Sequence, residues 1–274
     1  MSFETFTNFF AQVQEYVFGE TDDESSPTGK VLSEDSLGNQ NPADEVAHTE
    51  EVKSSEATDE DFSPEFLTRL IENSLDKETK IVNATKFLAA CELVPQLFNG
   101  LGSALKKGNG KLLEKVKIVR GRQQEAAKEL GVEADALSLQ DIIERDIKNG
   151  VTHSGKKARQ ATRNIIRLVW FLDFISMLFD LISTKPDATL RSIIQECWAN
   201  TLGPRNLWLV NKATTQALKV APVPPKQDFF VLLGLAGKSH EEMEPIFQTW
   251  VDRVDIVSKE MWAWLISRDL ESVP

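Results

Sequence analysis

Apolar residues recur at helical spacing along most of the chain, and segments that alternate in the manner of β-strands are nearly absent. Ser63-Pro64-Glu65 is typical of a helix start, where Ser63 caps the backbone and Pro64 takes the first position. A long helix is expected over about 156–184, and the last helix over about 239–268, where Ser239 and Glu242 match a capping box. The pattern predicts an all-α fold of about eight helices.

The first 62 residues differ in character from the rest. Aromatic and aliphatic residues in 1–18 stand at helical spacing, so this segment is a possible amphipathic helix that docks on a protein partner, on the chain itself or on a membrane. Residues 19–62 are rich in Asp, Glu, Ser and Thr and hold few large apolar residues, which predicts an acidic disordered linker. The folded domain is expected to span residues 63–274.

Charge follows the same division. Residues 1–63 hold sixteen acidic residues against Lys30 and Lys53, a balance of −14; since the whole chain carries −11, residues 64–274 carry +3. No dense basic patch with interleaved aromatic residues appears, so we expect no nucleic-acid partner. Cys91, Cys197 and three histidines form no metal-ligand spacing, so we expect no metal site and two buried, reduced thiols in a cytoplasmic protein.

Candidate chemistry is concentrated in the helix over 158–182. Arg159 and Arg163 are one helical turn apart, so their guanidinium groups project side by side and suit a phosphate or a carboxylate. Arg167 continues the series one turn later, which favours a simple basic stripe instead. The following turns are strongly apolar, but polar and charged residues interrupt them, so a buried helix is favoured over a membrane span. An anion clamp beside an apolar helix suggests a ligand with a charged head and apolar tails.

Four stretches, in this order, resemble the glycolipid transfer protein family. They are FLAACELVPQLFNGLGSAL (87–105), ARQATRNIIRLVWFLDFISML (158–178), LGPRNLWLVNKATTQALKVAPVP (202–224) and the acidic-aromatic last helix. The resemblance covers about 210 residues. It implies a two-layer helical sandwich that encloses one lipid, and transfer of that lipid between membranes with no cofactor.

The resemblance also implies particular site residues. Aligned on Trp170, the chain is similar to the phosphate-selecting branch, which includes ceramide-1-phosphate transfer proteins, with Arg159, Arg163 and Lys115 at the lipid headgroup. The lipid pocket would be lined by Trp170, Phe171, Phe174 and Leu178. Trp208 matches a tryptophan that docks the family's proteins transiently on membranes. An aromatic ring in a basic neighbourhood suits the membrane-water interface.

Two positions depart from the family pattern. The family's aspartate, which accepts a hydrogen bond from the sphingolipid amide, falls on Lys111, and its histidine, which contacts the amide carbonyl, falls on Asn206. Lys111 removes an acceptor and adds a cation to the headgroup site, while Asn206 retains a donor. The bound lipid is therefore expected to be ceramide-1-phosphate or a glycerophospholipid such as phosphatidic acid.

Three function classes compete. The first is an intermembrane carrier of a phosphate-headed lipid, and the alternative is a lipid sensor or adaptor with little transfer activity, which the acidic segment and the N-terminal helix would suit. An enzyme is disfavoured because His153 and His240 stand near helix ends without a partnered nucleophile motif. Asp173 and Glu196 are expected to be hydrogen-bonded structural groups, so no catalytic residue is assigned.

A shortened chain that begins at Ser63 should retain the melting temperature and the lipid uptake of the full chain, because every candidate site residue lies after that point. Thermal unfolding and uptake of a fluorescent phosphate-headed lipid would be measured for both chains. A large fall in melting temperature would show that the first segment packs on the domain and that the boundary at residue 63 is wrong.

Overall fold

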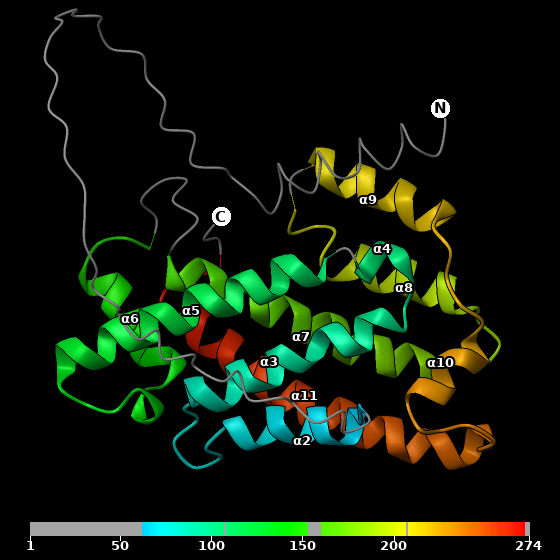
Figure 1. The fold of residues 1–274 in the computed structure, drawn as a ribbon, viewed down its shortest axis with the longest axis horizontal. Helices are drawn as coiled ribbons and strands as arrows, with labels where there is room; N and C mark the ends of the chain where they lie inside the picture. The colour runs from blue at the N-terminus through cyan, green and yellow to red at the C-terminus, as the bar shows by residue number, and fades with distance from the viewer. Residues whose placement is uncertain (1–61, 107, 153–159, 207, 272–274) are drawn as a thin grey trace, which may run out of the picture. The chain divides into compact units, whose positions relative to one another are not determined.

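Five helices pack in a closed ring in the computed structural model (Figure 1). In ring order they are α2 (Pro64–Ser74), α3 (Ala84–Asn99), α5 (Asn109–Leu130), α7 (Ala161–Thr184) and α11 (His240–Ile266), and α11 returns to contact α2. The structure describes residues 62–106, 108–152, 160–206 and 208–271. Over these residues it contains helices and two isolated β-bridges but no strand, so the predicted all-α class is confirmed.

Shorter helices surround the ring. They are α4 (Ser103–Lys106), α6 (Leu139–Lys148), α8 (Leu190–Asn200), α9 (Trp208–Val220), α10 (Lys226–Leu232) and a 3-10 turn at Ala134–Ala136. α6 and α8 pack on α7, and α9 packs on α8. In the view of Figure 1, α3 and α5 form a layer in front of α7 and α11, and α5 contacts α7 directly.

Helix boundaries follow the capping signals of the sequence. The Ser63 side chain accepts a hydrogen bond from the backbone N–H of Phe66, and Ser239 and Glu242 form the predicted reciprocal capping box. The start of α7 differs from its predicted start at about 156. The helix begins at Ala161 after Gln160, whose side chain makes no capping hydrogen bond, and residues 153–159 lie outside the described part of the chain.

The turn after α3 depends on one glycine. Gly102 has a φ of +102°, and a Cβ added there would lie 2.5 Å from the backbone oxygen of Pro222. A side chain is therefore excluded by both conformation and space. The turn leads into α4, a single helical turn, and then into α5.

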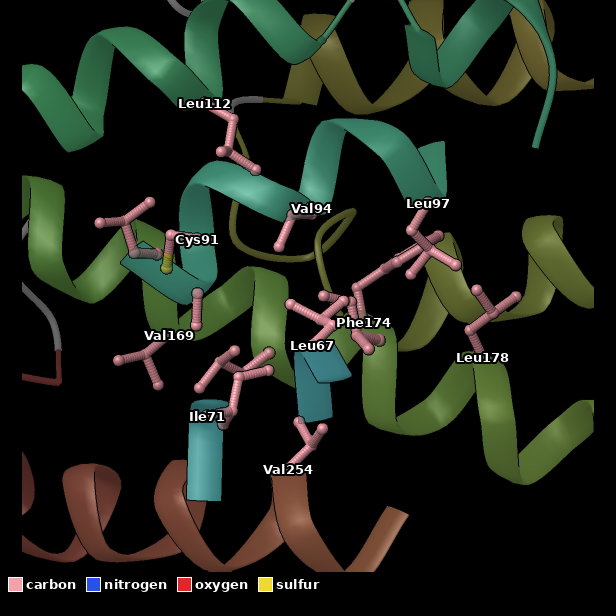
Figure 2. Packing of buried hydrophobic residues seen from close by; sticks show 14 of the residues in the cluster. Leu67, Ile71, Cys91, Val94, Leu97, Leu112, Val169, Phe174, Leu178 and Val254 are labelled. Carbon is pink, nitrogen blue, oxygen red and sulfur yellow. The ribbon is translucent and has the colours of Figure 1, made fainter. Parts of the chain in front are cut away.

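All five ring helices contribute to one hydrophobic core (Figure 2). Figure 2 labels Leu67 and Ile71 from α2, Cys91, Val94 and Leu97 from α3, Leu112 from α5, Val169, Phe174 and Leu178 from α7, and Val254 from α11. Because α5, α6, α8 and α11 all contact α7, that helix is buried on most of its surface. Burial in protein thus accounts for its apolar run, and none of the described helices is long and apolar enough to cross a membrane.

The predictions for the N-terminal region fall largely outside this description. The possible amphipathic helix over 1–18 and all but the last residue of the acidic segment 19–62 belong to undescribed residues. From Phe62 onward, every described residue belongs to one compact unit.

Candidate functional site

One face of α7 is half-buried and carries charge followed by an aromatic ring. Arg163, Arg167 and Trp170 are all half-buried and follow one another at intervals of four and three residues. This spacing places them along one face of the helix. Most other positions of α7 are fully buried, so this face is where the helix can meet a ligand.

Lys115 approaches this face from α5. It is only 3% exposed, although lysine is almost never fully buried without a partner. Burial is the main reason that the pKa of Lys115 falls from 10.5 to about 7, and the charge of Arg167 is the next. Lys111 and Arg163 also lower this pKa, while Glu114 opposes them. The charges of Lys111, Arg163 and Arg167 thus all act on Lys115, and we refer to these four residues as the cation cluster.

The cation cluster retains capacity for an anion. The Nε of Arg163 is buried and has no hydrogen-bond partner within the described residues. Lys111 is partly exposed and forms an ion pair with Glu114 over 3.3 Å. Positive charge exceeds the negative charge that acts on Lys115, so a phosphate or carboxylate placed here would be attracted electrostatically and could accept charge-assisted hydrogen bonds.

The arginine pair differs in part from the predicted one. Arg159 lies outside the described residues, so its place in the site stays a prediction. Within α7 the i,i+4 pair consists of Arg163 and Arg167, and Arg167 has a larger effect on the pKa of Lys115 than Arg163 has. The sequence analysis treated Arg167 as part of a basic stripe. Its i+4 spacing from Arg163 is compatible with a second clamp residue, but a basic stripe has the same spacing, so the sequence alone could not distinguish the two.

A second group of charges holds the turn between α8 and α9 against the bundle. Arg205 donates a hydrogen bond to Asp173 of α7 over 2.5 Å, and the Nε1 of Trp262 on α11 donates to the same carboxylate over 3.0 Å. Ser258 donates to Asp173 as well. The guanidinium of Arg205 lies 4.9 Å from the ring centroid of Trp262 and 5.8 Å from that of Trp170. Asp173 is therefore a hydrogen-bonded structural group, as predicted, and Arg205 brings the turn next to Trp170.

Two predicted residues follow Arg205 in the chain. Asn206 is half-buried, and its Nδ2 donates to the backbone oxygen of Leu202 over 2.6 Å. Trp208 begins α9 and is 72% exposed, with the Lys212 ammonium 4.9 Å from its ring centroid. An exposed indole beside a cation suits the membrane-water interface, so the surroundings of Trp208 fit the docking role expected for it.

The predicted pocket residues occupy different environments. Phe171 is half-buried and its ring centroid lies 5.8 Å from that of Phe98 on α3. Phe174 packs edge-on against Phe98 at 5.7 Å, and both Phe174 and Leu178 are fully buried in the core. Trp170 and Phe171 thus mark the boundary between the core and the cation cluster.

Other reactive groups are held in structural roles. Burial raises the pKa of the Cys91 thiol, and it raises the pKa of the Cys197 thiol to about 12, so both buried thiols are poor nucleophiles. Glu196 is ion-paired with Lys185 over 2.6 Å, as a structural role would require. His153 is not among the described residues. Within the described part of the chain, no group of His, Cys, Asp and Glu side chains is arranged to hold a metal ion.

Lys115→Met should raise the free energy of unfolding by about 3 kcal/mol near pH 6, because it removes a buried charge that its surroundings disfavour. Between pH 7 and 10.5 the unfolded chain binds a proton at Lys115 that the folded chain has released, so the parent gains stability as pH rises. The advantage of the variant should therefore be constant below about pH 7 and decline toward pH 10.5. Denaturant unfolding of both proteins across this range measures it.

Lys117→Met is the matched control, because Lys117 lies on the same helix but is exposed. This change should alter the free energy of unfolding by less than about 0.5 kcal/mol at any pH. A stability difference between Lys115→Met and the parent that does not depend on pH would contradict the assignment of a lowered pKa to Lys115.

Comparisons with known proteins agree with the all-α fold. Residues 82–235 match the family described as glycolipid transfer protein (GLTP). A glycolipid transfer protein of Aureobasidium melanogenum is 23% identical over 193 residues, which cover 70% of this chain and 87% of that protein. Accelerated cell death 11 of Arabidopsis thaliana is 27% identical over 155 residues, which cover 56% of this chain and 67% of that protein.

Solved structures show the same fold at low sequence identity. The crystal structure of human ceramide-1-phosphate transfer protein in complex with 12:0 ceramide-1-phosphate matches with a TM-score of 0.66 and 16% identity, over 78% of this chain and 100% of that chain. A mutant of Arabidopsis accelerated cell death 11 complexed with C12 ceramide-1-phosphate matches with a TM-score of 0.58 and 19% identity, over 76% of this chain and 97% of that chain. The family match spans more than half of the sequence, and this chain belongs to the glycolipid transfer protein family.

Proposed function

We propose that the protein binds one phosphate-headed lipid and carries it between membranes. The observation that carries this proposal is the buried Lys115, which lies close enough to Arg163 and Arg167 for their charges to lower its pKa. At an effective dielectric constant of about 20, a phosphate in contact with one such charge gains about 4 kcal/mol of Coulomb attraction. A neutral sugar gains none of this, so the cation cluster selects phosphate over sugar.

The cation cluster, through Lys111, also affects which phosphate-headed lipid the protein prefers. Human ceramide-1-phosphate transfer protein and a mutant of Arabidopsis accelerated cell death 11 have been crystallised with ceramide-1-phosphate. In this chain Lys111 stands where the resemblance places the acceptor for the sphingolipid amide, and its ammonium group cannot accept a hydrogen bond. A glycerophospholipid such as phosphatidic acid has no amide N–H to satisfy, so it fits the site at least as well as ceramide-1-phosphate does.

The hydrocarbon tails would enter the bundle past Trp170 and Phe171. Both rings are half-buried beside the cation cluster, whereas Phe174 and Leu178 behind them are fully buried. Tails that reach Phe174 must therefore displace packed side chains from the space that Phe98 now shares with it. Trp208 would place the turn between α8 and α9 at the membrane surface during loading and release.

A carrier and a sensor differ in a measurable way. A carrier moves a fluorescent phosphatidic acid from donor to acceptor vesicles at a rate proportional to protein concentration, whereas a sensor or adaptor binds the lipid and transfers little of it. We also infer that the protein is not an enzyme, because the reactive groups described above are buried or ion-paired. The lipid recovered after transfer should be chemically unchanged.

Arg163→Glu should reduce the transfer of phosphatidic acid by at least about a hundredfold, because it replaces an attraction to the phosphate with a repulsion. Transfer between vesicles would be measured together with circular dichroism. Arg268→Glu makes the same change in net charge at a residue that is ion-paired with Glu144 over 2.8 Å outside the cation cluster, and transfer should stay within about twofold of the parent. Full transfer by a folded Arg163→Glu variant would refute the headgroup assignment.

A further inference from the structure

Two buried N–H groups on α7 have no hydrogen-bond partner within the described residues. One is the Nε of Arg163 in the cation cluster, and the other is the indole Nε1 of Trp170. Buried donors are almost always paired, so an unpaired donor in a folded protein requires an explanation. The Arg163 donor belongs with the bound phosphate, but the donor on Trp170 is neutral and calls for a different partner.

Trp262 provides an internal comparison for Trp170. The Arg205 guanidinium lies over both rings, at 5.8 Å from the Trp170 centroid and 4.9 Å from the Trp262 centroid. The Nε1 of Trp262 donates to Asp173 over 3.0 Å, whereas the Nε1 of Trp170 has no acceptor among the described residues. Packing beside Arg205 therefore does not by itself leave an indole unpaired.

The position of Trp170 relates the unpaired donor to the headgroup site. Trp170 follows Arg167 by three residues on the same helix face, which corresponds to about 4.5 Å along the helix axis. On its other side lies the turn that carries Arg205 and Asn206, and the Nδ2 of Asn206 already donates to Leu202. Trp170 thus lies one helical turn beyond Arg167, between the cation cluster and the turn that carries Arg205.

We propose that the Nε1–H of Trp170 donates a hydrogen bond to an acyl carbonyl oxygen of the bound lipid. This inference rests on the proposed function, since it requires a phosphate held by the cation cluster. In a diacyl phospholipid the ester carbonyl is a few bonds from the phosphate, it is an uncharged acceptor, and it marks the point where the polar head meets the hydrocarbon tails. The protein therefore recognises the acyl linkage as well as the phosphate, and it prefers phospholipids with acyl chains to phospholipids with ether-linked alkyl chains.

The expected preference for the acyl lipid can be estimated from the burial of the Trp170 N–H. The Trp170 donor is already removed from water, so pairing it with a carbonyl requires no further desolvation of the donor. Binding of an acyl lipid should therefore exceed binding of a matched ether lipid by roughly tenfold. Phenylalanine at position 170 keeps an aromatic ring but has no N–H, so it should abolish the preference for the acyl lipid, whatever its effect on the affinity for both lipids.

The test uses the full chain and two probes that differ only in the linkage, diacyl phosphatidic acid and dialkyl-ether phosphatidic acid with chains of equal length. Their competition for the protein would be measured for the parent, Trp170→Phe and Trp262→Phe. We expect a preference for the diacyl lipid of roughly tenfold in the parent and in Trp262→Phe, and a ratio near one in Trp170→Phe.

Each outcome has one meaning. Equal binding of both lipids by the parent, or an unchanged preference in Trp170→Phe, overturns the role of Trp170 and leaves the proposed function intact. Failure of the parent to bind either lipid overturns the proposed function itself. If Trp170→Phe does not fold, the indole 1H–15N signal of Trp170 in the parent decides the matter, since it should move downfield with the diacyl lipid alone, and equal shifts with both lipids would overturn the inference.

Discussion

The burial of the Lys115 ammonium beside the arginines of α7 is the interaction on which the properties of the site depend. A buried cation is costly unless counter-charges compensate for lost hydration, and here Lys111, Arg163 and Arg167 outweigh the opposing charge of Glu114. The pKa of Lys115 is lowered for this reason: the folded chain favours the neutral amine above about pH 7, whereas an ordinary lysine keeps its charge up to about pH 10.5. A bound phosphate would supply negative charge beside Lys115, raise its pKa and so favour the protonated ammonium. Ligand selection and the protonation of Lys115 are therefore coupled.

The rest of the fold keeps this arrangement from relaxing. α5 and α7 belong to a closed ring with α2, α3 and α11, and one core joins all five helices, so the two helices cannot separate to relieve the repulsion without disrupting the core. The carboxylate of Asp173 lies on the same helix as the arginines but is engaged by Arg205, Ser258 and Trp262. Its charge thus serves to hold the turn before α9, and the cation cluster remains positive.

Features that depend on local spacing could be predicted from the sequence, and features that depend on long-range packing could not. The caps at Ser63 and Ser239, the end of α7 before Pro186 and the all-α class follow from patterns within a few residues. The role of Arg167 was assigned too little weight, because only the approach of Lys115 from α5 distinguishes a clamp residue from a basic stripe. The contacts of Arg205 with Asp173 and Trp262 join residues that are 32 and 57 positions apart, and no sequence periodicity predicts such contacts.

The central claim is that the cation cluster selects a phosphate-headed lipid. Native mass spectrometry of the full chain, after incubation with vesicles that hold equal amounts of phosphatidic acid, ceramide-1-phosphate and a neutral glycosylceramide, tests it most directly. The account predicts one phosphate-bearing lipid per chain and no bound glycosylceramide. Binding of the neutral glycolipid in preference to both phosphate lipids would contradict it.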